Sequence, residues 1–230
     1  MNLIKYALST LTLLLIAYGF YQAIYVAPTE MTMGHIQRIF YYHVPSAWTA
    51  MLLFFANFVA SVVYLVRRSP VADAWALAYA EVGVVFCTIV LVTGPLWAKP
   101  VWGIWWTWDA RLTTTLVLWL IYVAYLMLRR FSEGQQTPTL AAALAVFGFL
   151  DVPVVYMSIR WWRTQHPQPV FAGGPGSGID PAMRYAVMVN WVAFIFLAAL
   201  LAWARYRIVS MEQADEKSAT LRSLQQTEVH

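Results

Sequence analysis

Six long apolar stretches alternate with shorter polar segments along the chain. They run approximately over residues 6–27, 45–66, 74–96, 112–128, 140–159 and 185–204. Each is close to the roughly 17 to 25 residues that an α-helix needs to cross the hydrocarbon core of a membrane. The apolar positions are continuous and do not alternate with polar ones, which indicates helices and not the strands of a membrane barrel. The pattern predicts an all-α integral membrane protein, a bundle of six transmembrane helices.

The composition excludes an ordinary soluble domain. Hydrophobic residues make up 61% of the 230 residues and charged residues only 11%, whereas a soluble domain carries about 25% charged residues. The mean hydropathy is +0.60. The same figures exclude a disordered chain and a nucleic-acid binder. The single cysteine, Cys87, lies in an apolar run, so the sequence offers neither a structural disulfide nor a thiolate metal cluster.

Positive residues mark alternate ends of the apolar stretches and predict the orientation. The flanking residues are Lys5, Arg67, Arg68, Arg129, Arg130, Arg205 and Arg207. Because positive residues concentrate in cytoplasmic loops, we expect these ends, and both termini, to lie in the cytoplasm. The chain then consists of a six-span domain over residues 1–207 in the cytoplasmic (inner) membrane and a polar cytoplasmic tail over residues 208–230.

The three outer segments, at 28–44, 97–111 and 160–184, are longer than the inner loops at 67–73 and 129–138 and contain more histidine and aromatic residues. We therefore expect function at the outer face, in these loops. A glycine-rich run at 173–178 lacks the lysine of a phosphate-binding loop and predicts a flexible outer turn.

The outer segment 97–113 holds five tryptophans within twelve residues. They are Trp97, Trp102, Trp105, Trp106 and Trp108. If the segment is helical, Trp102, Trp105 and Trp106 share one face through i+3 and i+4 spacing. Asp109, three residues after Trp106, continues that face. We interpret the face as an aromatic platform for a large, flat, apolar ligand. A plain aromatic belt at the membrane interface is the alternative.

Two histidines lie next to the ends of predicted spans. His43 precedes the second stretch and His166 follows the fifth. His166 directly precedes a proline and one residue separates His43 from Pro45, so we expect both where helical geometry breaks. Neutral imidazole binds iron, copper and zinc. Since no cysteine or outer acid cluster completes a zinc site, the pair suits the two axial positions of a haem. An interfacial hydrogen-bonding role is the alternative for each. His35 has no comparable context and is expected on the surface.

Charge in the outer segments is not balanced. The cations are Arg38, Lys99, Arg111, Arg160, Arg163 and Arg184, and the acids are Glu30, Asp109 and Asp180. Arginine pairs well with carboxylates, so the propionates of a haem are candidate partners. Lipid headgroups are the alternative. Two acids, Glu81 and Asp151, fall inside predicted spans, where a proton or ligand route and a packing contact are both open.

The stretch 102–113, Trp-Gly-Ile-Trp-Trp-Thr-Trp-Asp-Ala-Arg-Leu-Thr, resembles the tryptophan-rich WWD signature of the haem-handling proteins of cytochrome c biogenesis. The flanking pieces at 38–48 and 161–166 and the six spans resemble the haem exporter C branch of that family. The resemblance covers nearly the whole chain from the first span to the sixth. It does not extend to the tail or the glycine-rich turn.

This resemblance implies a haem-binding membrane protein and not an enzyme. By position, His43 and His166 would ligate the iron of a haem held without thioether bonds, that is haem b. The cradle of the macrocycle would include Trp102, Trp105, Trp106, Trp108 and Asp109, with Arg111 beside them. The implied partners are a membrane-anchored haem chaperone (protein E), a small helper membrane protein (protein D) and an ABC transporter of proteins A and B. This chain has no nucleotide-binding motif, so any ATP hydrolysis belongs to a partner.

Two other functions fit the pattern less well. A membrane b-type cytochrome that transfers electrons usually places its haem histidines inside spans at two depths, whereas no predicted span here contains a histidine. A transporter that moves haem through its own bundle would draw on Glu81 and Asp151 as polar groups within the membrane.

Overall fold

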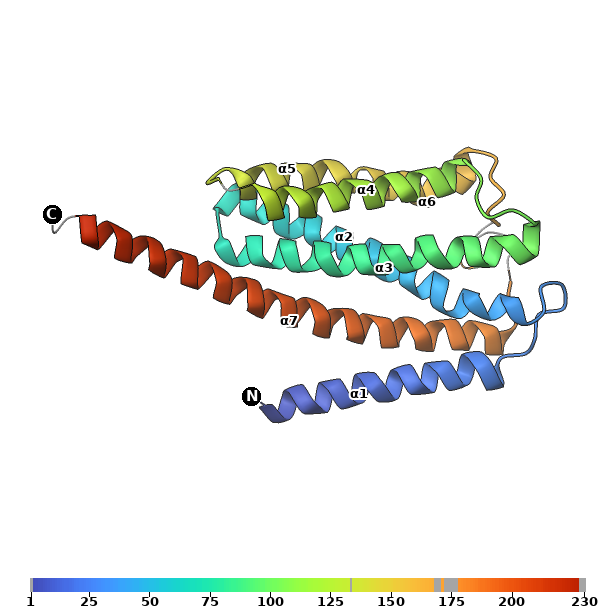
Figure 1. The fold of residues 1–230 in the computed structure, drawn as a ribbon. Coiled ribbons are helices and arrows are strands. Elements are labelled where there is room, and N and C mark those ends of the chain that lie inside the picture. The colour runs from blue at the N-terminus through green and yellow to red at the C-terminus, as the bar shows by residue number, and fades with distance from the viewer. Residues whose placement is uncertain (1, 133, 168–170, 172–177, 228–230) are drawn as a thin grey trace.

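The computed structural model describes residues 2–132, 134–167, 171 and 178–227, and these form helices joined by short connections (Figure 1). The elements are α1 (Asn2–Tyr21), the π-helix η1 (Gln22–Val26), the 3₁₀-helix η2 (His35–Ile39), α2 (Phe40–Arg67), α3 (Pro70–Trp102), α4 (Ala110–Phe131), α5 (Thr137–Phe149), α6 (Asp151–Trp161) and α7 (Pro181–Thr227). Within the described residues, six helical stretches are long and apolar enough to cross a membrane. The expected all-α fold with six spans is confirmed.

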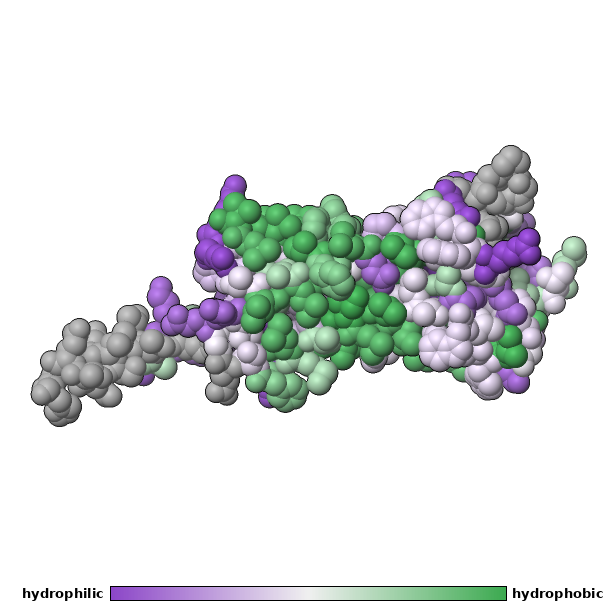
Figure 2. Space-filling model, turned by 90° about the horizontal axis from the view of Figure 1, so that it is seen from above, coloured by the Kyte–Doolittle hydropathy of each residue, from purple (hydrophilic) through white to green (hydrophobic). Residues whose placement is uncertain are grey.

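The six membrane-crossing stretches run alternately in opposite directions, and α5 and α6 follow one another within one stretch (Figure 1). We refer to the end that carries η2, the α3–α4 connection and the segment after α6 as the loop end. The opposite end, where α1 begins and α7 ends, is the terminal end. Figure 2 shows a hydrophobic surface over the middle of the bundle and hydrophilic residues towards both ends. That distribution suits a bundle whose middle faces lipid.

Helix α3 has clear start and stop signals in the sequence. The side chain of Ser69 accepts a hydrogen bond from the backbone N–H of Ala72 at 3.4 Å, and Pro70 opens the helix. Gly103 ends it in the left-handed conformation, at φ 79°, which glycine adopts without steric cost. The helix extends six residues beyond the predicted span, so the first part of the predicted outer segment 97–111 is helical.

Helices α2, α3 and α4 pack closely because small residues allow it. A Cβ atom on Gly83 would lie 2.7 Å from the ring of Phe54, so only glycine permits this approach of α3 to α2. The ring of Phe54 in turn stacks on Tyr122 of α4, with 3.9 Å between centroids. Helix α1 joins the bundle through α7, where Asn190 donates a hydrogen bond to the carbonyl of Gly19 at 3.0 Å.

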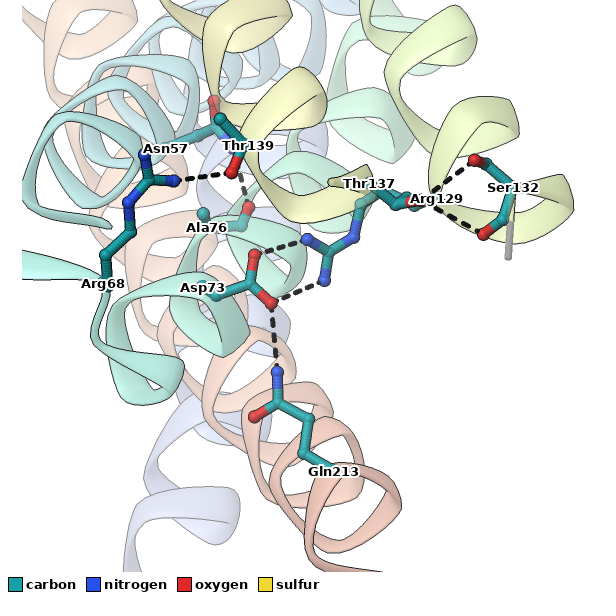
Figure 3. A network of polar contacts seen from close by, with 9 residues as sticks. All are labelled: Asn57, Arg68, Asp73, Ala76, Arg129, Ser132, Thr137, Thr139 and Gln213. Carbon is teal, nitrogen blue, oxygen red and sulfur yellow. Dashed lines mark hydrogen bonds and ion pairs between the residues drawn. The ribbon is translucent and has the colours of Figure 1, made fainter. Parts of the chain in front are cut away.

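A buried ion pair fixes three helices to one another at the terminal end (Figure 3). Asp73 of α3 binds Arg129 of α4 through two contacts, one of them 2.9 Å from Nη2 to Oδ2. Gln213 of α7 donates a third hydrogen bond to the same carboxylate at 3.0 Å. Because a buried charge is costly unless it is paired, this network favours a single arrangement of α3, α4 and α7.

The two acids predicted inside spans have different surroundings. Glu81 pairs with Arg205 of α7, with 3.1 Å between Oε1 and Nη2, and therefore makes a packing contact. Asp151 follows a break in the fifth span, where the N–H of Leu150 bonds to the carbonyl of Phe147 at 3.1 Å instead of continuing the α-helical ladder. Asp151 Oδ2 has no hydrogen-bond partner among the described residues.

Two further predictions concern the boundary of the membrane domain at residue 207 and the glycine-rich turn at 173–178. Helix α7 runs without interruption through position 207, so the predicted boundary between the membrane domain and the tail falls inside one helix. The cytoplasmic location of residues 208–230 stays a prediction. The glycine-rich turn lies outside the described residues except for Gly178.

Candidate functional site

Two adjoining cavities open between the helices at the loop end. The larger has a volume of about 1000 Å³, which lies in the range of ligand pockets. Eight residues line both cavities: His43, Ala47, Met51, Trp97, Trp102, Arg111, His166 and Pro167. The two histidines singled out in the sequence are thus brought to one space, although they come from α2 and from the segment after α6.

His43 is buried in the first turns of α2. Its Nδ1 lies 2.8 Å from Oγ1 of Thr93 on α3, and its ring meets the indole of Trp97 edge to face, with 6.0 Å between centroids. The predicted helix break at this position is wrong, because α2 begins at Phe40 and continues through Pro45. A proline this near the N-terminus removes a single bond from the ladder, so the helix persists. The membrane-crossing stretch therefore includes His43, contrary to the prediction that no span contains a histidine.

His166 lies half-buried in the segment that follows the C-terminal end of α6. Its Nδ1 donates a hydrogen bond to the carbonyl of Pro167 at 2.9 Å. Burial, together with the positive charge of Arg111, lowers the pKa of His166 to about 4. The ring is therefore neutral near pH 7, and neutral imidazole is the form that binds metals.

Asp109 connects two parts of the cavity wall, the start of α4 and the segment of His166. Its Oδ1 accepts a hydrogen bond from the backbone N–H of Leu112 at 3.0 Å, the N-cap of α4. Its Oδ2 accepts another from the backbone N–H of Gln165 at 3.2 Å. Asp109 is not among the residues that line either cavity. It acts on the site by holding the segment of His166 against the start of α4.

The tryptophans do not share one face. The shared face is expected only if the segment 97–113 is helical, and this condition is not met, because α3 ends at Trp102 and the next helix begins at Ala110. The left-handed Gly103 turns the chain and separates the side chains. Trp102 and Trp106 line the cavities, whereas Trp105 is 55% exposed and Trp108 is 76% exposed, and neither lines a cavity.

Among the described residues, Arg111 is the one lysine or arginine that lines the cavities. It lies in the first turn of α4 and donates to the carbonyl of Val155 on α6. The other outer cations do not line the cavities, and Lys99, for example, donates to the carbonyl of Gly103 at 2.9 Å. His35 is exposed and also lies outside both cavities.

The segment between η1 and η2 forms a further wall of the larger cavity. The carboxylate of Glu30 accepts hydrogen bonds from the backbone N–H groups of Met33 and Thr32, the latter at 2.8 Å. These bonds, first that of Met33 and then the hydroxyl of Thr32, hold the pKa of Glu30 below its usual value. The segment is thereby folded on itself, without a helix.

Sequence reasoning missed two contributors to the site. Trp97 was counted with the tryptophans but not assigned to the site, because the span was expected to end before it. Thr93 was missed because a threonine inside an apolar span gives no signal of its own. Its contact with His43 depends on how α2 and α3 pack.

The arrangement suits a large, flat, mostly apolar ligand that brings its own metal. Within the described residues there is no group of three or more His, Cys, Asp or Glu that could hold a bare metal ion, whereas zinc sites use three or four protein ligands. Two imidazoles facing one cavity instead match the axial positions of a haem, which supplies four nitrogens itself. The buried indole N–H groups of Trp97 and Trp106 have no acceptor among the described residues. Together with Arg111, they offer donors to polar groups at the edge of such a ligand.

Comparison with known proteins shows which family this chain resembles. The family model "CcmC: Heme exporter protein C" matches residues 1–221. A heme exporter protein C of Bradyrhizobium diazoefficiens is 37% identical over 202 residues, which cover 87% of this chain and 76% of the relative. The heme exporter protein C of Escherichia coli K12 is 37% identical over 190 residues (81% and 76%). A putative cytochrome c biosynthesis ccmC-like mitochondrial protein of Marchantia polymorpha is 34% identical over 186 residues (81% and 79%).

Proposed function

The chain belongs to the haem exporter protein C family, and we propose that it binds haem b in the cavity between His43 and His166 and delivers it to a membrane-anchored haem chaperone. This family is a membrane component of haem handling in cytochrome c biogenesis and not an enzyme. Haem is accordingly the cargo of the protein and not a resident redox centre.

The convergence of His43 and His166 on one cavity carries the proposal. In both rings the contact made by the structure involves Nδ1, with Thr93 in one case and the carbonyl of Pro167 in the other. Among the described residues, no hydrogen bond involves Nε2 of either ring. Two imidazoles with one free nitrogen each can ligate one haem iron from opposite sides.

The rest of the cavity suits the remainder of a haem molecule. The indoles of Trp97, Trp102 and Trp106 offer apolar surface for the macrocycle. Arg111 supplies a positive charge for a propionate, to which guanidinium binds well. Trp105, Trp108 and Asp109 lie outside the cavity, so we assign the exposed indoles to the membrane interface and Asp109 to positioning.

The two histidines differ in how firmly they are held, and this difference supports a handover. His43 belongs to a long helix and is 8% exposed. His166 belongs to a non-helical segment tied to α4 by the contact between Asp109 and Gln165. We propose that His166 is the ligand that releases first, when the chaperone offers its own ligand to the iron.

Location and partners follow from charge and family. The positive residues that flank the spans lie at the terminal end, which supports a cytoplasmic position for that end and an outer position for the cavity. We propose the cytoplasmic membrane as the location. The proposed partners are the haem chaperone (protein E), the helper protein D and the ABC transporter subunits A and B, which would carry out any ATP hydrolysis.

Electron transfer is less well supported. Although His43 belongs to a membrane-crossing helix, both histidines lie at the loop end and line the same cavity. A transmembrane electron carrier needs haems at two depths of the bundle, and this pair supplies the ligands of one.

A transfer assay tests the proposal. The haem-loaded protein is incubated with the soluble domain of the chaperone, and pigment is then extracted with acid–acetone from each protein. We expect extractable haem on the parent and acid-stable haem on the chaperone afterwards. The variants His43→Ala and His166→Ala should donate little, and His35→Ala should donate as the parent does. The proposal is wrong if the chaperone gains as much haem from the double histidine variant as from the parent.

A further inference from the structure

Thr93 of α3 lies directly behind the ring of His43. Its Oγ1 is 2.8 Å from Nδ1 of His43 and 2.7 Å from the carbonyl oxygen of Ile89, one turn earlier in the same helix. Thr93 is not among the residues that line either cavity. It therefore contacts the histidine from the side that faces away from the proposed haem.

The direction of these hydrogen bonds follows from counting protons. A threonine hydroxyl has one proton to donate and two lone pairs that can accept. The carbonyl of Ile89 can only accept, so the proton of Thr93 is used in that bond. The lone pairs of Oγ1 then face Nδ1 of His43, and Nδ1 must be the donor.

A second threonine in the same helix shows this polarity independently. Oγ1 of Thr88 donates to the carbonyl of Val84 at 2.8 Å and accepts from Nε1 of Trp119, also at 2.8 Å. An indole N–H can only donate. Thr88 thus binds a ring N–H while it donates to the carbonyl four residues earlier, which is the arrangement that Thr93 makes with His43.

A neutral imidazole has a single N–H, so the protonation of Nδ1 determines the state of Nε2. With the proton of His43 on Nδ1, Nε2 keeps its lone pair. His166 reaches the same state by another route, because its Nδ1 lies 2.9 Å from the carbonyl of Pro167, which can only accept. Both rings therefore offer Nε2 as the metal-binding nitrogen before any ligand arrives.

We propose that Thr93 is a positioning residue for haem, which holds His43 in the tautomer and orientation that leave Nε2 free for iron. This inference rests on the proposed haem-binding function and adds a residue to it. Accepting the Nδ1–H bond also makes the ring a better electron donor, as hydrogen-bonded partners of metal-bound histidines do. Thr93 thereby strengthens the bond to iron and lowers the reduction potential of the haem.

The alternative is that Thr93 only fills space between α2 and α3. Valine has the shape of threonine without the hydroxyl, so Thr93→Val keeps the packing and removes the acceptor. Thr93→Ser keeps the hydroxyl and removes a methyl group. A packing role predicts similar behaviour of the two variants, or more damage from serine. The positioning role predicts damage from valine and parental behaviour of serine.

The experiment measures haemin affinity and midpoint potential of the full-length protein in detergent or nanodiscs. We expect Thr93→Val to bind haemin about tenfold to hundredfold more weakly, the usual cost of losing such a partner, and to have a higher midpoint potential. Thr93→Ser should match the parent in both. Thr88→Val is the matched control, because Thr88 lies in the same helix and its hydroxyl contacts Trp119 instead of a histidine.

The outcomes separate this inference from the proposed function. If Thr93→Val keeps parental affinity and potential while His43→Ala loses haem, Thr93 has no positioning role and the haem site stands. If His43→Ala binds haemin as the parent does, the haem site itself is wrong. Should the valine variant fail to fold, Thr93→Ala replaces it. Equal affinity and potential of Thr93→Ala and Thr93→Ser would then overturn the inference.

Discussion

The carboxylate of Asp109 accepts a hydrogen bond from the backbone N–H of Gln165, the residue before His166, at 3.2 Å. With its other oxygen the same carboxylate caps helix α4. The aspartate of the WWD-like stretch therefore connects the start of α4 with the segment that carries His166. It lies outside the cavity and still determines where one of the proposed iron ligands is placed.

Asp109→Ala should weaken haem binding although it removes no atom from the cavity wall. The loss of a helix cap costs about 0.5–2 kcal/mol, and here the segment of His166 is released as well. We expect affinity for haemin to fall by about tenfold, equivalent to about 1.4 kcal/mol. Asp109→Asn, which keeps an acceptor for the cap, should lose less. The measurement is a haemin titration followed by absorption.

A cap at the terminal end provides the control for this variant. Ser69→Ala removes the N-cap of α3 and should lower thermal stability without changing haemin affinity. If Asp109→Ala binds haemin as tightly as Ser69→Ala does, the tie between Asp109 and Gln165 has no bearing on the site.

Substitution of tryptophans that line the cavities should affect haem binding more than substitution of those that do not. Burial of one indole face contributes about 1.5–3 kcal/mol, so Trp102→Ala or Trp106→Ala should weaken haem binding about tenfold to hundredfold. Trp105→Ala, at a position that is 55% exposed, should bind haem as the parent does. The Soret position should be unchanged in all three variants, because an indole makes no bond to iron. An equal loss from Trp105→Ala would contradict the geometry of the cavity.

The buried ion pair at the terminal end should matter for stability and not for haem. Asp73→Ala leaves Arg129 unpaired between helices, and breaking a buried pair costs about 3–5 kcal/mol. We expect a clear fall in the melting temperature in detergent, with parental haem content at low temperature. Glu212→Ala is the control, because Glu212 is exposed and 3.7 Å from Arg205, and such a pair is worth about 0–1 kcal/mol. Equal melting temperatures would refute the role of the Asp73–Arg129 pair.

Thiol labelling tests the orientation in the membrane. Trp108→Cys and Ser218→Cys place exposed thiols at the loop end and on the far part of α7. In spheroplasts, whose cytoplasmic membrane is intact, a membrane-impermeant maleimide should label Trp108→Cys at once and Ser218→Cys only after permeabilisation. The native Cys87 is buried and should contribute little background. The opposite pattern would place the cavity in the cytoplasm and exclude delivery at the outer face.

Much of the fold could be predicted from the sequence, because a membrane allows few solutions. Backbone groups in lipid must bond within a helix, so six apolar stretches mean six helices. The helix ends could be predicted less well. Periodicity does not show that α3 extends to Trp102, since tryptophans suit both a helix and an interface. Nor does it show that α2 starts before His43, since Pro45 indicates a break.

The sequence indicates the two histidines of the candidate site but not the arrangement of the residues around them. The sequence indicates His43 and His166 because each lies near a proline at the end of a predicted span. The structure brings both to one cavity, although the helix break expected at His43 is absent. The spacing rule that grouped Trp102 with Trp105 assumes a continuous helix, and one left-handed residue, Gly103, invalidates it. The contact of Thr93 with His43 depends on tertiary packing, and local sequence gives no signal of it.

The central claim is that His43 and His166 bind the same haem iron, and the spectrum of the ferric haem-loaded protein tests it most directly. The parent should show a six-coordinate, low-spin bis-histidine spectrum. His43→Gly and His166→Gly should each lose haem or change to a different coordination, and added imidazole should restore the parental spectrum. His35→Gly should match the parent throughout. Parental spectra in both the His43 and His166 variants, or equal damage from the His35 variant, would contradict the claim.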